Sequence, residues 1–93
     1  MENKDTHRAD AIKDILRDFI TERFLIFSSL DSFEETNSFM EKGIIDSTGV
    51  LELLEFIEEK FGIKIEDEEV IPDNFDSLQK LVNYILRKLG YAG

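Results

Sequence analysis

Three segments of the chain repeat the same spacing of apolar side chains, and this spacing restricts the fold more than any other feature. Within residues 12–24, 50–61 and 78–89, apolar residues recur at intervals of three and four positions. That period matches an α-helix with one buried face. No segment shows a convincing alternation of apolar and polar residues, which a half-buried strand would require. The sequence therefore predicts an all-α protein.

We expect a small four-helix bundle, built of three main helices and one short helix, with a long loop between the first two main helices. Ninety-three residues suffice for one compact domain over residues 1–93. The predicted elements are a helix over about 6–27, a loop over 28–45, a helix over about 47–61, a short helix over about 66–71 and a last helix over about 76–89.

Particular residues set the expected ends of these helices. Gly62 suits a left-handed cap at the end of the second main helix. Pro72 ends the short helix because a proline ring disrupts a helical backbone. Asp76 stands three residues before Gln79, which resembles a capping box at the start of the last helix. The side chains expected to anchor the long loop to the core are Phe33, Phe39, Met40, Ile44 and Ile45.

The chain has a formal net charge of −10, and residues 41–76 hold twelve acids against three bases. A negative field of this kind repels nucleic acid and anionic membranes and attracts basic protein surfaces.

The sequence also lacks the marks of several other classes of protein. No apolar run approaches the roughly 20 residues of a membrane span, no apolar signal segment opens the chain, and cysteine is absent. The acidic run at 66–69 matches no calcium-binding loop. We expect a cytoplasmic monomer that binds neither metal nor nucleic acid.

Ser47, next to Asp46 at the start of the second main helix, is the residue most suggestive of chemistry. A serine nucleophile needs a base, and the only histidine is the distant His7. A serine-hydrolase elbow is half matched, because Ile45 replaces its first glycine. We therefore expect no catalytic residue and no enzymatic activity. Both Asp46 and Ser47 are good helix caps, so these residues also suit an acidic helical adaptor without a prosthetic group.

Several motifs occur together in this chain: Asp46-Ser47, Leu51-Glu52-Leu53, Glu58-Glu59 before Phe61-Gly62, and Phe75-Asp76-Ser77-Leu78. In combination they resemble the acyl carrier protein family over essentially the whole domain. The resemblance implies that Ser47, with Asp46 as its motif neighbour, carries phosphopantetheine through a phosphodiester on Oγ. It also implies that the thiol of this arm holds an acyl group as a thioester, which supplies a thiol to a chain without cysteine.

The resemblance further implies an acidic docking face for partner enzymes that carry basic patches. The implied partners are a phosphopantetheinyl transferase, an acyl- or aminoacyl-adenylating ligase, and acyltransferase or synthase enzymes. Small, charge-dominated interfaces give such partners fast encounter and weak hold. The residues expected on the docking face are Thr48, Leu51, Glu52, Glu55, Glu58 and Glu59.

Two residues depart from the family's pattern. Thr48 stands where a leucine usually follows the serine, and Gly49 stands where many fatty-acid carriers have an acid. We interpret the first as a weakened apolar docking contact and the second as a lost docking charge. The variant resembles freestanding specialised carriers that work beside an adenylating ligase. The expected function is an acyl carrier in fatty-acid-like or specialised lipid or secondary metabolism, with an aminoacyl or peptidyl carrier as the alternative.

Overall fold

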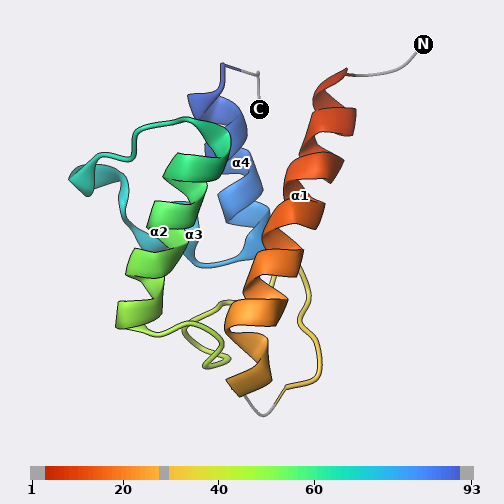
Figure 1. Cartoon of the computed structure of the whole chain (residues 1–93), viewed down its shortest axis with the longest axis vertical. Coiled ribbons are helices and arrows are strands. Elements are labelled where there is room, and N and C mark those ends of the chain that lie inside the picture. The colour runs from red at the N-terminus through yellow and green to blue at the C-terminus, as the bar shows by residue number, and fades with distance from the viewer. Residues whose placement is uncertain (1–3, 28–29, 91–93) are drawn as a thin grey trace.

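The computed structural model describes residues 4–27 and 30–90, and every regular element in this part of the chain is helical. The predicted all-α helical bundle is therefore confirmed. Figure 1 shows α1 running in the opposite direction to α2 and α4. The elements are α1 (Lys4–Arg23), the 3₁₀ turn η1 (Leu25–Phe27), α2 (Ser47–Phe61), the 3₁₀ turn η2 (Asp67–Glu69), α3 (Pro72–Phe75) and α4 (Leu78–Lys88).

The predicted apolar stripes form the core, in which α1 contacts α4. Helix α2 is held to α1 by stacked rings of Phe19 and Phe56, whose centroids are 4.0 Å apart. Each fully buried Leu or Ile side chain contributes about 2 kcal/mol to folding. The stripe residues that are at most 2% exposed are Ile12, Leu16, Ile20, Leu53, Ile57, Leu78, Leu81 and Ile85.

Residues 38–40 of the loop before α2 are fixed by Asp76, the residue that follows α3. The backbone N–H of Phe39 donates to the carbonyl oxygen of Asp76 at 2.9 Å, and that of Met40 donates to its Oδ1 at 3.1 Å. The hydroxyl of Ser38 also donates to this carboxylate. These bonds turn Phe39 into the core and Met40 outward, so the prediction that Met40 is a buried anchor is wrong: its side chain is 56% exposed. The loop residues that are buried are Phe33, Phe39, Ile44 and Ile45.

Helix α1 ends as an α-helix at Arg23, before the predicted end near residue 27. The tighter turn of η1 follows, as is common at helix ends. It buries Leu25 at 5% exposure and leaves Ile26 67% exposed. Helix α2 ends as predicted, because Gly62 adopts a left-handed conformation with φ of 67° and its N–H bonds to the carbonyl oxygen of Glu58.

The segment between α2 and α4 differs most from the prediction. The helical turn expected over 66–71 is only η2, Asp67–Glu69. Pro72 begins α3 instead of ending a helix, because the first helical position needs no N–H donor. Helix α4 starts at Leu78, and its cap is Ser77, whose Oγ accepts the N–H of Lys80 at 3.1 Å. Asp76 does not cap α4, because its carboxylate is bonded to the loop. Among the described helices, none is long and apolar enough to cross a membrane.

Candidate functional site

Ser47 is the first residue of α2, and its side chain is exposed. The helix is capped by Asp46, whose Oδ1 accepts the backbone N–H of Gly49 at 2.7 Å. Within the described part of the chain, the Ser47 hydroxyl forms no hydrogen bond. The structure thus assigns the cap to Asp46 and leaves the Ser47 hydroxyl free for chemistry.

The start of α2 also suits a phosphate group. The backbone N–H groups of Ser47 and Thr48 have no hydrogen-bond acceptor among the described residues, whereas that of Gly49 is satisfied by Asp46. Free N–H groups and the positive end of the helix dipole favour an anion at this position. The residues present therefore fit a phosphodiester on Ser47 Oγ.

An apolar groove of about 340 Å³ begins at Ser47 and lies between α2 and the η2–α3 segment. Leu51, on the α2 side, is 64% exposed, and Met40 of the preceding loop, 56% exposed, also lines the groove. Such exposed apolar side chains mark a surface that binds another apolar group. The other groove residues are Val50 and Leu54 of α2, and Val70, Ile71, Pro72, Phe75 and Asp76 of the opposite wall.

Glu69 of η2 connects the η2–α3 wall of this groove to α4 through hydrogen bonds and an ion pair. Its Oε1 accepts the Tyr84 hydroxyl at 2.8 Å, the Lys88 ammonium at 3.0 Å and the Glu66 N–H at 3.0 Å. The bond from Glu66, followed by those from Lys88 and Tyr84, lowers the pKa of Glu69 to about 2. Burial, together with the bond to Glu69, raises the pKa of Tyr84. The carboxylate form of Glu69 thus holds η2, and with it Val70 and Ile71, in place.

We expect Glu69→Gln to lower the melting temperature at neutral pH. Because the pKa of Glu69 in the folded chain lies below its ordinary value of 4.5, its stabilising contribution is complete above that pH and disappears as the pH falls toward about 2. Thermal unfolding at a series of pH values should show the wild type and the variant converging across this window. Glu68→Gln is the matched control, since Glu68 is exposed and unbonded among the described residues. Parallel curves of melting temperature against pH for Glu69→Gln and the wild type would contradict a stabilising role of the Glu69 carboxylate.

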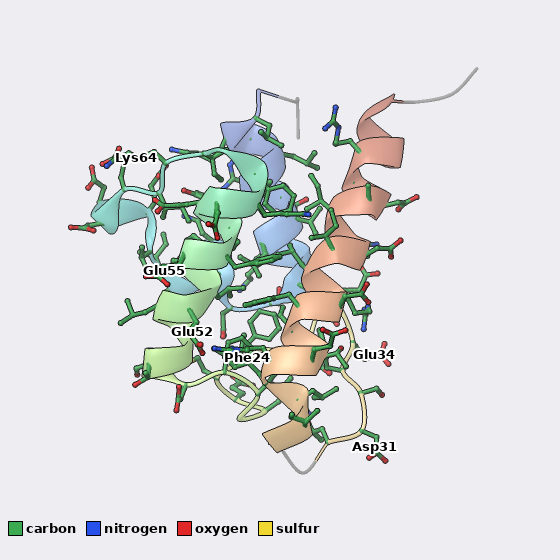
Figure 2. All side chains as sticks on the ribbon, viewed as in Figure 1. Phe24, Asp31, Glu34, Glu52, Glu55 and Lys64 are labelled. Atoms are coloured by element: carbon green, nitrogen blue, oxygen red, sulfur yellow. The ribbon has the colours of Figure 1, made fainter. Side chains whose placement is uncertain are left out.

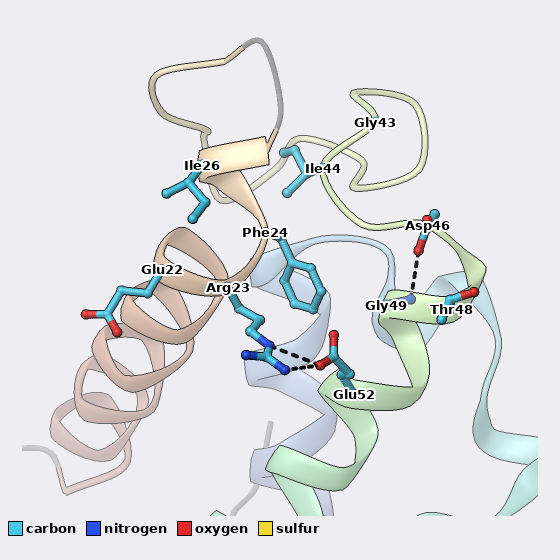
Figure 3. A pocket seen from close by; sticks show the side chains of 10 residues that line it. All are labelled: Glu22, Arg23, Phe24, Ile26, Gly43, Ile44, Asp46, Thr48, Gly49 and Glu52. Atoms are coloured by element: carbon cyan, nitrogen blue, oxygen red, sulfur yellow. Dashed lines mark hydrogen bonds and ion pairs between the residues drawn. The ribbon is translucent and has the colours of Figure 1, made fainter.

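The predicted docking residues do not share one environment. Thr48 and Glu52 lie on the side of α2 that faces α1, away from the groove. Glu52 is ion-paired with Arg23, whose Nε donates to its Oε2 at 3.0 Å (Figure 3). This bond raises the pKa of Arg23. Glu52 is therefore engaged within the chain before any partner arrives.

The remaining acids lie farther along α2. Figure 2 shows Glu55 on the outer side of the helix. Glu58 accepts the backbone N–H of Ile65 at 2.8 Å and so helps to fix the turn after α2. Glu55 and Glu59 are exposed, and neither has a hydrogen bond or ion pair with any described residue. Of the four predicted docking glutamates, Glu55 and Glu59 are thus the free ones.

Gly49 has a packing role that the sequence did not indicate. The residue is buried, and a Cβ at this position would lie 2.9 Å from Cε1 of Phe24 and 3.1 Å from Cγ2 of Ile45. The ring of Phe24, just beyond the end of α1, approaches α2 closely because Gly49 has no side chain. Besides removing a docking charge, as interpreted from the sequence, Gly49 therefore permits a close packing contact.

Sequence reasoning also missed the groove walls and the partner of Glu52. Val70 and Ile71, 37% and 44% exposed, form an apolar pair between an acidic run and Pro72, outside any helical stripe. Two adjacent apolar residues in a polar segment without helical periodicity were the sequence signal that could have indicated an exposed apolar surface. No comparable signal links Arg23 to Glu52, which are 29 positions apart.

The family model of the phosphopantetheine attachment site matches residues 10–85. This span includes Ser47 and both walls of the groove. The chain belongs to this family. It is a carrier domain of the acyl carrier protein family, as the resemblance implied, and it carries covalently bound phosphopantetheine without being an enzyme. A carrier domain interacts with a phosphopantetheinyl transferase and with synthase enzymes. The alternative of an adaptor without a prosthetic group is thereby excluded.

Proposed function

We propose that Ser47 is the attachment residue of this carrier domain and that its cargo is an acyl group. The observation that supports both statements is an exposed hydroxyl, unused by the helix cap, at the end of an apolar groove. When bound, phosphopantetheine supplies the thiol that holds the cargo as a thioester. Asp46 keeps the start of α2 intact, and the free N–H groups of Ser47 and Thr48 accommodate the phosphate.

The groove favours an acyl over an aminoacyl cargo. Among the described residues that line it, Asp76 has the only carboxylate, which is already bonded to Ser38 and to the N–H of Met40. The ammonium of an aminoacyl group would find no free carboxylate there, and losing water without such a partner is costly. An alkyl chain, by contrast, gains about 0.8 kcal/mol for each buried methylene.

We further propose that partners dock on the outer side of α2. Leu51 offers an exposed apolar contact, and Glu55 and Glu59 offer unpaired charges to a basic patch. Glu52 and Glu58 contribute to the negative field while engaged within the chain. Thr48 and Gly49 match freestanding carriers, so the proposed setting is fatty-acid-like or specialised lipid or secondary metabolism, with loading by an adenylating ligase.

The test is incubation with a broad-specificity phosphopantetheinyl transferase and, in separate reactions, coenzyme A, octanoyl-coenzyme A and glycyl-coenzyme A. The reaction forms an Oγ–phosphorus bond and breaks a P–O bond of the pyrophosphate of coenzyme A. Adenosine 3′,5′-bisphosphate leaves, and the serine proton passes to a base of the transferase. Intact mass should show one added arm, with its cargo, and the rate should fall with added salt because docking is electrostatic. Burial of one or two methylenes of the octanoyl chain in the groove should make the octanoyl product more stable than the glycyl product by about 1 kcal/mol, or about 4–8 °C in melting temperature.

Each part of the proposal has its own contradicting result. Absence of any mass gain with several transferases would overturn attachment at Ser47. Equal melting temperatures for the octanoyl and glycyl products would overturn the preference for an acyl cargo. A rate that is independent of salt would overturn electrostatic docking.

A further inference from the structure

A second hollow lies beside Ser47, between the start of α2 and the end of α1. It has a volume of about 640 Å³ and shares no lining residue with the apolar groove. Asp46 and Thr48, the two neighbours of Ser47 in the chain, both line it (Figure 3). An enzyme that reaches the Ser47 hydroxyl therefore comes close to this pocket.

The end of α1 shapes the pocket through two local features. Phe24 packs onto the bare backbone of Gly49, which brings its ring to the floor between the helices (Figure 3). The change from α-helix to the tighter η1 turn then holds Ile26 out in water, at 67% exposure, while Leu25 is buried. An exposed isoleucine on the wall of a pocket that already has an aromatic floor marks a contact surface.

The charges around the pocket are mostly negative. Glu22, Asp46 and Glu52 line it against a single cation, Arg23, which is paired with Glu52. Glu22 is exposed and has no hydrogen bond or ion pair with any described residue. A free carboxylate beside apolar and aromatic side chains fits the aliphatic stem and cationic head of a lysine or arginine.

We propose that this pocket receives a lysine or arginine side chain of the phosphopantetheinyl transferase, so that α1 and η1 belong to the surface by which the carrier domain is recognised. This inference rests on the attachment at Ser47 proposed above. Complementary charge favours a basic protein over nucleic acid, and the net charge of −10 disfavours a second copy of this chain. A cationic side chain seated in a pocket is a common anchor of protein interfaces.

The experiment measures kcat and KM of the transferase for the carrier domain, with coenzyme A as donor, at low and high salt. The transferase is one that loads the wild-type chain. Glu22→Lys should raise KM roughly tenfold at low salt with kcat unchanged, and high salt should reduce the effect because a rim charge is screened. Ile26→Ser should raise KM roughly fivefold at both salt concentrations, because it removes apolar contact and not charge.

Asp14→Lys is the matched control. It makes the same charge change at an exposed position of α1, eight residues or about 12 Å nearer its N-terminus. The low-salt measurement is made at about 0.1 M, where the Debye length of about 10 Å is still shorter than this separation. Its KM should stay close to that of the wild type, and all three variants should melt like the wild type. Equal effects of Glu22→Lys and Asp14→Lys on KM would overturn the proposal that this pocket receives a cationic side chain. Wild-type KM values for Glu22→Lys and Ile26→Ser would overturn it as well. Loading of Ser47→Ala by the same transferase would overturn attachment at Ser47, and this inference with it.

Discussion

Ser47→Ala is expected to abolish the mass gain that the wild-type chain shows with coenzyme A and a transferase. Removing Oγ removes the only atom proposed to form the phosphodiester. Ser47→Asn and Ser47→Asp should fail equally, although both side chains are good helix caps. All three variants should keep the wild-type free energy of unfolding to within about 0.5 kcal/mol, because Asp46 caps α2 and the Ser47 side chain is exposed.

Thr48→Ala is the control for this experiment. Thr48 carries the adjacent hydroxyl, is also exposed, and has an N–H group that is equally free among the described residues. Thr48→Ala should be loaded to completion, because the hydroxyl that it removes lies toward α1 and not at the groove. A mass gain that survives in Ser47→Ala and disappears in Thr48→Ala would transfer the attachment to Thr48.

Gly49→Asp, which introduces the acid that many fatty-acid carriers have at this position, is expected to destabilise the fold by about 3 kcal/mol. Its Cβ would lie 2.9 Å from Cε1 of Phe24 and 3.1 Å from Cγ2 of Ile45, so these packed side chains must shift. Overpacking of this kind typically costs about 1–3 kcal/mol, and placing a carboxylate in the same contact adds a desolvation cost of about 1–3 kcal/mol. The midpoint of urea unfolding should therefore shift to a lower urea concentration than in the wild type.

Thr48→Asp is the matched control for this substitution, since it adds the same charge one residue earlier at an exposed position. An acid in the first turn of a helix stabilises it by about 0.3–1 kcal/mol. The control should therefore be neutral or slightly stabilising. If Gly49→Asp proved as stable as Thr48→Asp, the close contact between α1 and α2 would be refuted.

The helical class of the fold could be predicted from periodicity, because the stripes through Leu16, Leu53 and Leu81 mark the faces that are buried. Features that depend on contacts between distant segments could not. Met40 is apolar and was placed in the core, yet bonds to Asp76 turn it outward. Pro72 breaks helices in general, but here it starts one, because the preceding chain is already extended.

The site was predictable to a similar degree. The resemblance indicated Ser47, and the family match confirmed the carrier class. Sequence alone left the cap to either Asp46 or Ser47, and the hydrogen bond to Gly49 decides it. The docking glutamates were predicted as one set because sequence spacing shows which residues share a helix. Spacing does not show that Arg23 pairs with one of them across 29 positions.

The hydrogen bonds around Asp76 have a consequence for the order of events during synthesis. The turn at 38–40, which leads into α2, is fixed by acceptors on a residue 36–38 positions later in the chain. On the ribosome, this turn therefore lacks its acceptors until Asp76 has emerged. We accordingly expect the surface around Ser47 to become recognisable only after translation has passed α3, which makes prosthetic-group loading an event of the nearly finished polypeptide.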